Sequence, residues 1–164
     1  MPFYNYYDDF LKHLKITVPL PEGVDVLYPY EKPETVALVK QFYHSYYNDD
    51  HPRIMLIGIN PGRFGAGVTG IPFTDPIRLT SACGIENTLP QKPELSSKFI
   101  YEMIQKFGGV RSFYKKYLIS AVSPLGFVSD GKNLNYYDIR ALQTNLEPFI
   151  VDCMNQQLKM GAQS

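Results

Sequence analysis

Residues 53–76 read RIMLIGINPGRFGAGVTGIPFTDP, and this stretch decides the fold class of the chain. After Arg53 comes a short, continuous apolar run that is partly β-branched and ends at Gly58. Such a run is typical of a strand that is covered on both faces of a sheet. We therefore predict a central parallel strand over residues 53–58.

A second strand pattern follows later in the chain. Residues 117–122, YLISAV, are again short and apolar, and Ser123-Pro124 ends them. Between the two strand patterns, residues 99–107 place apolar side chains at helical spacing, and Gly108-Gly109 stops this helix. A helix that connects two strands forms a βαβ unit, in which the strands run parallel.

Helical spacing also marks three segments outside this unit: residues 3–14, residues 34–47, and residues 138–160 with an interruption at Pro148. Residues 17–32 contain several prolines and favour an extended connection. The sequence therefore predicts an α/β protein, specifically a three-layer α/β/α domain around a central parallel sheet. Because only two strands are evident, we expect this domain to be incomplete at its C-terminal end.

Composition limits the possible classes of protein. With 164 residues, of which 45% are hydrophobic, the chain is expected to form a single domain over residues 1–164 and to be a monomer. The formal net charge is +0, so any DNA-binding surface must be local. The two cysteines lack the spacing of a metal site, and neither a leader pattern nor a membrane-spanning run is evident. These features predict a cytoplasmic protein without a membrane association.

Residues 58–76, which follow the first strand, contain five glycines and three prolines. The carboxyl ends of parallel strands form the ligand crevice of an open sheet, so a constrained loop here is a candidate site. A surface loop rich in turn residues is the plain alternative. A phosphate-binding loop is disfavoured, because the pattern lacks a Gly-Lys-Ser/Thr end and does not have the spacing of the dinucleotide fingerprint.

The order of residues in this loop resembles the first motif of the single-strand-selective monofunctional uracil-DNA glycosylases and their bacterial relatives. The segments GINPGRFG and TGIPF match without gaps from Gly58 to Phe73. The resemblance implies that the protein binds DNA, flips a nucleotide out of the stack and hydrolyses the N-glycosidic bond of uracil or a related deaminated base. It implies an enzyme that uses no metal and no cofactor.

Asn60 is the expected catalytic residue. A neutral amide can accept a hydrogen bond from water while a neighbouring backbone group holds its other end. Such an amide positions the water without taking its proton, so the sugar must develop positive charge before the water attacks. The alternative is a local turn in which Asn60 precedes Pro61.

Other residues of the motif are expected to contact the substrate. The resemblance makes Phe73 the aromatic floor on which the flipped base stacks. Glycines in the loop permit close approach of the backbone to a ligand, and amides near Ile59 and Phe73 are expected to contact base carbonyls. The expected substrate contacts besides Phe73 are Ile59, Gly62, Phe64 and Gly70.

The match weakens beyond the first motif. Ala121 occupies the place where the family has an Asn that reads the uracil edge, so base reading is assigned to Asn133 or Asn135, with a turn and helix cap as the alternative. Arg63 and Ser123 are candidate DNA contacts, although Arg63 fits a solvated surface arginine equally well. The preferred base therefore stays open.

A second, His-Pro-containing motif of the family is not evident. His13, His44 and His51 all precede the first motif, so none can supply the histidine that this motif contributes. Two alternative functions follow: a catalytically impaired DNA-binding relative, and an unrelated α/β module that binds a nucleotide. The chemistry of the first motif favours the glycosylase.

Overall fold

A computed structural model describes residues 1–161. Strands β2 (Ile54–Gly58) and β3 (Tyr117–Ala121) pair in parallel, in a register that joins Ile54 to Tyr117 and Gly58 to Ala121. The connection between them contains helices α3 (Ala66–Thr69), α4 (Pro76–Ser81), α5 (Leu95–Phe107) and α6 (Val110–Lys116). The predicted α/β class and the parallel pairing are confirmed, while α3, α4 and α6 are additional elements.

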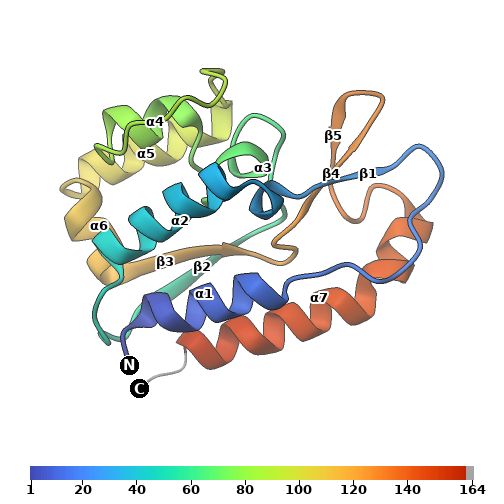
Figure 1. Cartoon of the computed structure of the whole chain (residues 1–164), viewed down its shortest axis with the longest axis horizontal. Helices are drawn as coiled ribbons and strands as arrows, with labels where there is room; N and C mark the ends of the chain where they lie inside the picture. The colour runs from blue at the N-terminus through green and yellow to red at the C-terminus, as the bar shows by residue number, and fades with distance from the viewer. Residues whose placement is uncertain (162–164) are drawn as a thin grey trace.

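Three longer helices complete the layers around this pair of strands: α1 (Phe3–His13), α2 (Pro33–Tyr46) and α7 (Arg140–Gly161). In Figure 1, α2 and α5 lie above β2 and β3, and α7 lies below them. Helix α1 contacts both α2 and α7. The predicted break at Pro148 is wrong, because α7 continues through this residue at the loss of one backbone hydrogen bond.

A small antiparallel sheet was not predicted. It has the order β1-β4-β5 and consists of β1 (Asp25–Leu27), β4 (Gly126–Ser129) and β5 (Lys132–Leu134). Asp130 and Gly131 join β4 to β5 with φ angles of 48° and 68°, as a two-residue hairpin turn of the primed type requires. Residues 25–27, expected to be a connection, thus form the edge of this sheet.

Strand β2 is less covered than its apolar sequence predicts. Ile54 is 54% exposed and Ile57 is 40% exposed. Within residues 1–161, β3 is the only strand that pairs with β2. The prediction of a strand covered on both faces is therefore wrong for these two side chains.

An arginine at the start of β2 ties the strand to its neighbours. The guanidinium of Arg53 forms a bidentate ion pair with Asp49, at 2.8 and 3.0 Å. It also donates to the carbonyl oxygens of Tyr114, His51 and Tyr46. Its side chain is only 2% exposed, so nearly all its hydrogen-bonding capacity is met inside the protein.

Buried aromatic rings fill the space between the helices and the parallel strands. Tyr7 of α1 stacks on Tyr43 of α2 with ring centroids 3.9 Å apart, and Phe42 meets Tyr114 edge to face. A second, smaller core of Val24, Phe127, Leu142 and Leu146 lies between the hairpin and α7. These two cores hold the β4–β5 hairpin next to the carboxyl ends of β2 and β3.

Candidate active site

A cavity opens at the carboxyl ends of β2 and β3, where the sequence places the motif loop. Its volume is about 500 Å³ when the open mouth is included. Its walls come from both strand ends, the motif loop, and the segment before α5, together with two tyrosines. The lining residues are Tyr7, Tyr30, Gly58, Ile59, Asn60, Pro61, Gly62, Ala66, Pro72, Phe73, Glu94, Ser96, Ser120, Ala121 and Pro124.

Asn60 is held in this cavity by the backbone that follows β5. Its Nδ2 donates to the carbonyl oxygen of Leu134 at 3.0 Å and to that of Pro61 at 3.3 Å. Its Oδ1 accepts the backbone N–H of Tyr136 at 2.9 Å. An amide oxygen has two lone pairs, so Oδ1 keeps the capacity to accept one more hydrogen bond.

Phe73 lies against the last residue of β2. A Cβ atom placed on Gly58 would come within 2.7 Å of the Phe73 ring, so only glycine allows this contact. Phe73 has a φ of 52°, a left-handed conformation that costs a bulky residue on the order of 1–3 kcal/mol. The structure therefore places the ring in the cavity with a strained backbone.

Two of the other four expected substrate contacts line the cavity, and two do not. Ile59 and Gly62 are part of its wall. The ring of Phe64 instead contacts two cations, and its centroid lies 4.3 Å from the Arg63 guanidinium and 5.2 Å from the Lys92 ammonium. Gly70 ends α3 with a φ of 72° and its carbonyl accepts the hydroxyl of Tyr30, which places it behind the wall.

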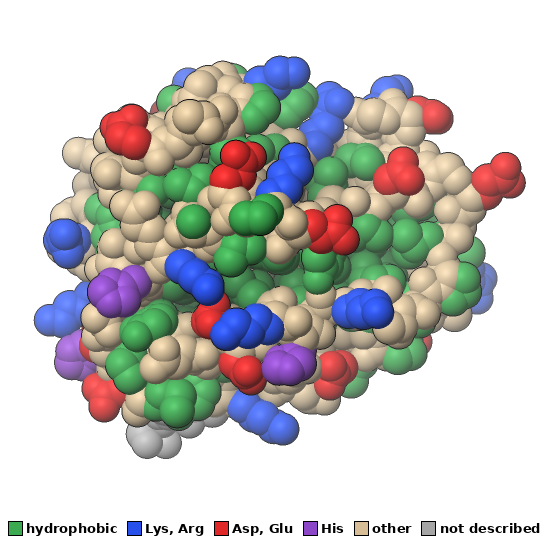
Figure 2. Space-filling view, viewed as in Figure 1, with side chains coloured by type: hydrophobic (Ala, Val, Ile, Leu, Met, Phe, Trp, Pro, Cys, Tyr) green, Lys and Arg blue, Asp and Glu red, His purple; other side chains and the backbone are tan. Residues whose placement is uncertain are grey.

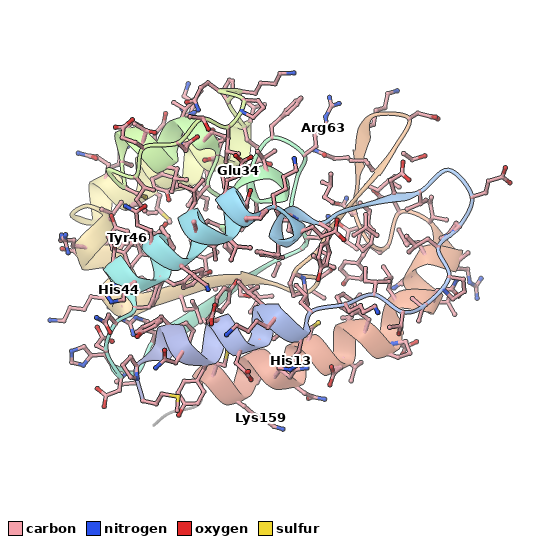
Figure 3. All side chains as sticks on the ribbon, in the orientation of Figure 1. His13, Glu34, His44, Tyr46, Arg63 and Lys159 are labelled. Atoms are coloured by element: carbon pink, nitrogen blue, oxygen red, sulfur yellow. The ribbon has the colours of Figure 1, made fainter. Side chains whose placement is uncertain are left out.

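The two candidate DNA contacts lie in different surroundings. Arg63 is half-buried beside the β4–β5 hairpin, as Figure 3 shows, and donates to the carbonyl of Gly131. Ser123 is fully buried, and its hydroxyl donates to the carbonyl of Leu125 at 2.6 Å. Burial removes Ser123 from the surface that a DNA phosphate could reach.

Neither candidate base-reading asparagine lines the cavity. Asn133 accepts the backbone N–H of Arg63 at 2.9 Å, and this bond ties the motif loop to β5. Asn135 contacts Asp138 through its backbone and its side chain, at 2.7 and 3.3 Å. Asn135 thus occupies the turn before α7 that its sequence also allowed.

Ala121 lies in the cavity wall, where its methyl group cannot read a base. Behind it, the buried Gln157 of α7 donates to the Ala121 carbonyl oxygen at 3.1 Å and bonds to the hydroxyl of Ser120. Sequence reasoning missed Gln157, because a single polar residue on a helix gives no local sign of such a contact. It also missed Glu94, which the structure places in the wall.

Asp75 fixes the end of the motif loop to α5. It is fully buried, caps α4 by accepting the backbone N–H of Arg78 at 2.8 Å, and pairs with the Arg78 guanidinium at 2.9 Å. It also accepts the backbone N–H of Glu94 at 2.9 Å, and its own N–H donates to Ser97. The pair Asp75-Pro76 is a recognisable helix start in the sequence.

The face of the molecule that Figure 2 shows carries no single dominant charge. Basic side chains are distributed there among acidic ones, in keeping with the net charge of +0. Among residues 1–161, no group of three His, Cys, Asp or Glu side chains is arranged to hold a metal ion. In the same part of the chain, no helix is long and apolar enough to span a membrane.

Comparison with known proteins identifies the family. The family model of the "Uracil DNA glycosylase superfamily" matches residues 44–160. The crystal structure of wild-type SMUG2 from Pedobacter heparinus is similar, with 45% sequence identity and a TM-score of 0.92 over 98% of this chain and 72% of that chain. No curated protein matches. The chain therefore belongs to the uracil DNA glycosylase superfamily, the hydrolytic DNA glycosylases of base-excision repair.

Proposed function

We propose that residues 1–164 act as one monomeric domain in the cytoplasm, which binds DNA, takes a flipped uracil or related deaminated base into the cavity, and hydrolyses its N-glycosidic bond. The observation that carries this proposal is the free lone pair of Asn60 Oδ1 in the same cavity as the Phe73 ring. The Asn60 amide orients the water molecule, and the Phe73 ring stacks against the base. The comparisons leave no reason to retain an unrelated nucleotide-binding module.

The reaction follows from the neutrality of Asn60. The bond between the base nitrogen and C1′ breaks with its electron pair on the base, leaving positive charge on the sugar. A water molecule that donates to Asn60 Oδ1 then forms a bond to C1′, and its proton passes to the departing base. An amide is too weak a base to deprotonate water first, so bond breaking leads.

DNA contacts are proposed at the rim beside the motif loop. Arg63 uses one N–H on the Gly131 carbonyl, which leaves other guanidinium donors for a phosphate. Lys92, whose ammonium lies 5.2 Å from the centroid of the neighbouring Phe64 ring, adds a second cation. A local basic pair of this kind suits a protein whose net charge is +0.

The proposed activity is tested with single- and double-stranded oligonucleotides that carry one uracil. Abasic product, cleaved by alkali and resolved on a gel, is the expected result, and oligonucleotides with hypoxanthine or xanthine define the range of bases. Binding of uracil-containing DNA without abasic product would instead support the catalytically impaired relative. Neither binding nor product would overturn the proposal.

Phe73→Ala should weaken binding of uracil-containing single strands by about 5- to 150-fold, the loss of about 1–3 kcal/mol of stacking. Phe99→Ala is the matched control, because this ring is exposed on α5 and lies outside the cavity wall. Fluorescence anisotropy with labelled oligonucleotides measures both variants. Equal affinities for wild type and Phe73→Ala would mean that the ring serves only the packing against Gly58.

A further inference from the structure

Glu94 places a carboxyl group in the cavity without an evident structural task. It occupies the cap position of α5, but its side chain accepts no capping hydrogen bond from the backbone N–H groups of that helix end. The side chain turns instead to the motif loop, where a Cβ atom on Gly62 or Gly65 would collide with its carboxyl oxygens. The two glycines thus allow the carboxyl group to lie directly on the loop backbone.

A hydrogen bond to a buried carboxylate fixes the backbone of Glu94. Its backbone N–H donates to the buried Asp75 at 2.9 Å, which joins it to the end of the motif loop. None of the ion pairs found within residues 1–161 includes Glu94. A half-buried carboxylate without a cationic partner is costly, and such costs are concentrated at functional sites.

The pKa of this carboxyl group reflects the same environment. Burial raises the pKa of Glu94, a hydrogen bond from Ser96 lowers it, and the charge of Asp75 raises it further, with a net increase. The charged form of Glu94 is therefore disfavoured by its surroundings. A ligand that donates a hydrogen bond to the carboxylate would relieve this cost.

Hydrogen bonds already engage most of the other polar side-chain atoms of the cavity, and the remaining lone pair of Asn60 Oδ1 is assigned to water. The two N–H groups of Asn60 bond to Leu134 and Pro61. The hydroxyl of Ser120 bonds to Gln157, and that of Tyr30 donates to Gly70 at 3.0 Å. Ala121 has no polar side chain, so Glu94 offers the strongest free hydrogen-bond acceptor in the wall.

We propose that Glu94 reads the flipped base by accepting a hydrogen bond from its ring N–H, an inference that rests on the proposed glycosylase function. Deamination converts the unprotonated N3 of cytosine into the N3–H of uracil, and the unprotonated N1 of adenine into the N1–H of hypoxanthine. A carboxylate attracts the N–H of either product and repels the lone pair of either parent base. One acceptor thus favours deaminated bases and disfavours cytosine and adenine.

The test compares uracil with N3-methyluracil, which lacks the ring N–H, in otherwise identical oligonucleotides. The wild type should prefer uracil in kcat/KM by about 10- to 150-fold, the value of a hydrogen bond to a charged group. In Glu94→Ala this preference should fall to within about threefold. Glu94→Gln, whose amide can also donate, should raise cytosine excision relative to uracil.

A matched control keeps the result specific. Glu102→Gln removes an exposed carboxylate from the same helix and should leave the preference unchanged. Retention of the wild-type preference in Glu94→Ala would overturn the role of Glu94 while leaving the glycosylase function intact. Absence of abasic product in the wild type would count against the function itself, and the ratio of Kd values for the two oligonucleotides would then decide the role of Glu94.

Glu94→Gln should also raise the Tm of the free protein at pH 7.5, on the order of a few °C. The pKa of Glu94 is higher in the folded protein than in the unfolded chain. Protonated Glu94 therefore contributes stability at pH values below the unfolded-state pKa, and this contribution is lost as the pH rises through the folded-state pKa. The difference in Tm should therefore shrink as pH falls toward 4.5. The other titratable or charged groups near Glu94 are the same in the wild type and in Glu94→Gln, so they do not contribute to the difference in Tm. These groups are Asp75, Arg78, Tyr7 and Tyr30. If the wild type and Glu94→Gln had the same Tm at pH 7.5 and also at pH 4.5, the charged carboxylate would not destabilise the folded protein.

Discussion

Asn60→Ala is expected to lower the rate of uracil excision by about 10²- to 10³-fold, comparable to the loss of one well-placed polar group from an active site. The reason is the single free lone pair of Oδ1, which no other side chain of the cavity can replace in position. Single-turnover kinetics on uracil-containing single strands measure the effect. Because Asn60 does not stack on the base, the Kd for DNA should stay within about threefold of the wild type.

A control separates catalysis from folding. Asn48→Ala removes an exposed amide far from the cavity and should keep the full rate. Loss of Asn60 also leaves the backbone N–H of Tyr136 without its acceptor, so Tm is recorded for each variant. A slow variant that binds DNA normally supports the role in orienting water, whereas full activity in Asn60→Ala would remove the mechanism.

Arg53→Met should destabilise the fold by about 3–5 kcal/mol, the range for removing one partner of a buried ion pair. The substitution leaves the carbonyl oxygens of Tyr114, Tyr46 and His51 without their donor, and Asp49 without its counterion. Urea denaturation followed by circular dichroism gives the free energy of unfolding. Since Arg53 directly precedes β2, loss of this anchor affects the strand that leads into the motif loop.

Arg111→Met is the matched control, because the Arg111 guanidinium lies 5.9 Å from the Tyr46 ring centroid on the surface. It should change the free energy of unfolding by less than about 1 kcal/mol. Equal stabilities of the two variants would mean that the Arg53 network contributes nothing beyond a surface cation–π contact.

The Arg53 network also carries a pH dependence. Burial acts to raise the pKa of Asp49, but the hydrogen bonds and charge of Arg53, aided by the His51 N–H, leave it below its usual value. A lowered folded-state pKa contributes stability above the unfolded value of 3.8 that is lost as pH falls. The difference in the free energy of unfolding between the wild type and Arg53→Met should therefore become smaller as the pH falls below 3.8.

The sequence was most informative where neighbouring residues specify structure together. Apolar runs at residues 53–58 and 117–122 were sufficient to predict two parallel strands, which the structure places at 54–58 and 117–121. The glycines and prolines that follow the first strand marked the candidate site. The β4–β5 hairpin was missed, although Asp130-Gly131 is a strong hairpin signal. Exposure of Ile54 and Ile57 could not be foreseen, because an apolar strand does not reveal which strands pair with it.

Contacts between distant residues account for the rest. The position of Asn60 was predicted, but its partners Leu134 and Tyr136 lie 74 and 76 residues away. Glu94 enters the wall because Asp75 holds its backbone, while Gln157 of α7 supports the wall from behind through Ser120 and the Ala121 carbonyl oxygen. No local pattern encodes these arrangements, since each depends on the packing of whole elements.

The hairpin that holds Asn60 has a consequence for the order of folding. Contacts across such long stretches of chain require costly loop closure, so they form late relative to the helices. The amide therefore acquires its orientation only after β4 and β5 have docked on the parallel strands. A chain in which β5 has not docked lacks the Leu134 and Tyr136 backbone partners of Asn60, so the catalytic amide is held only in the native fold.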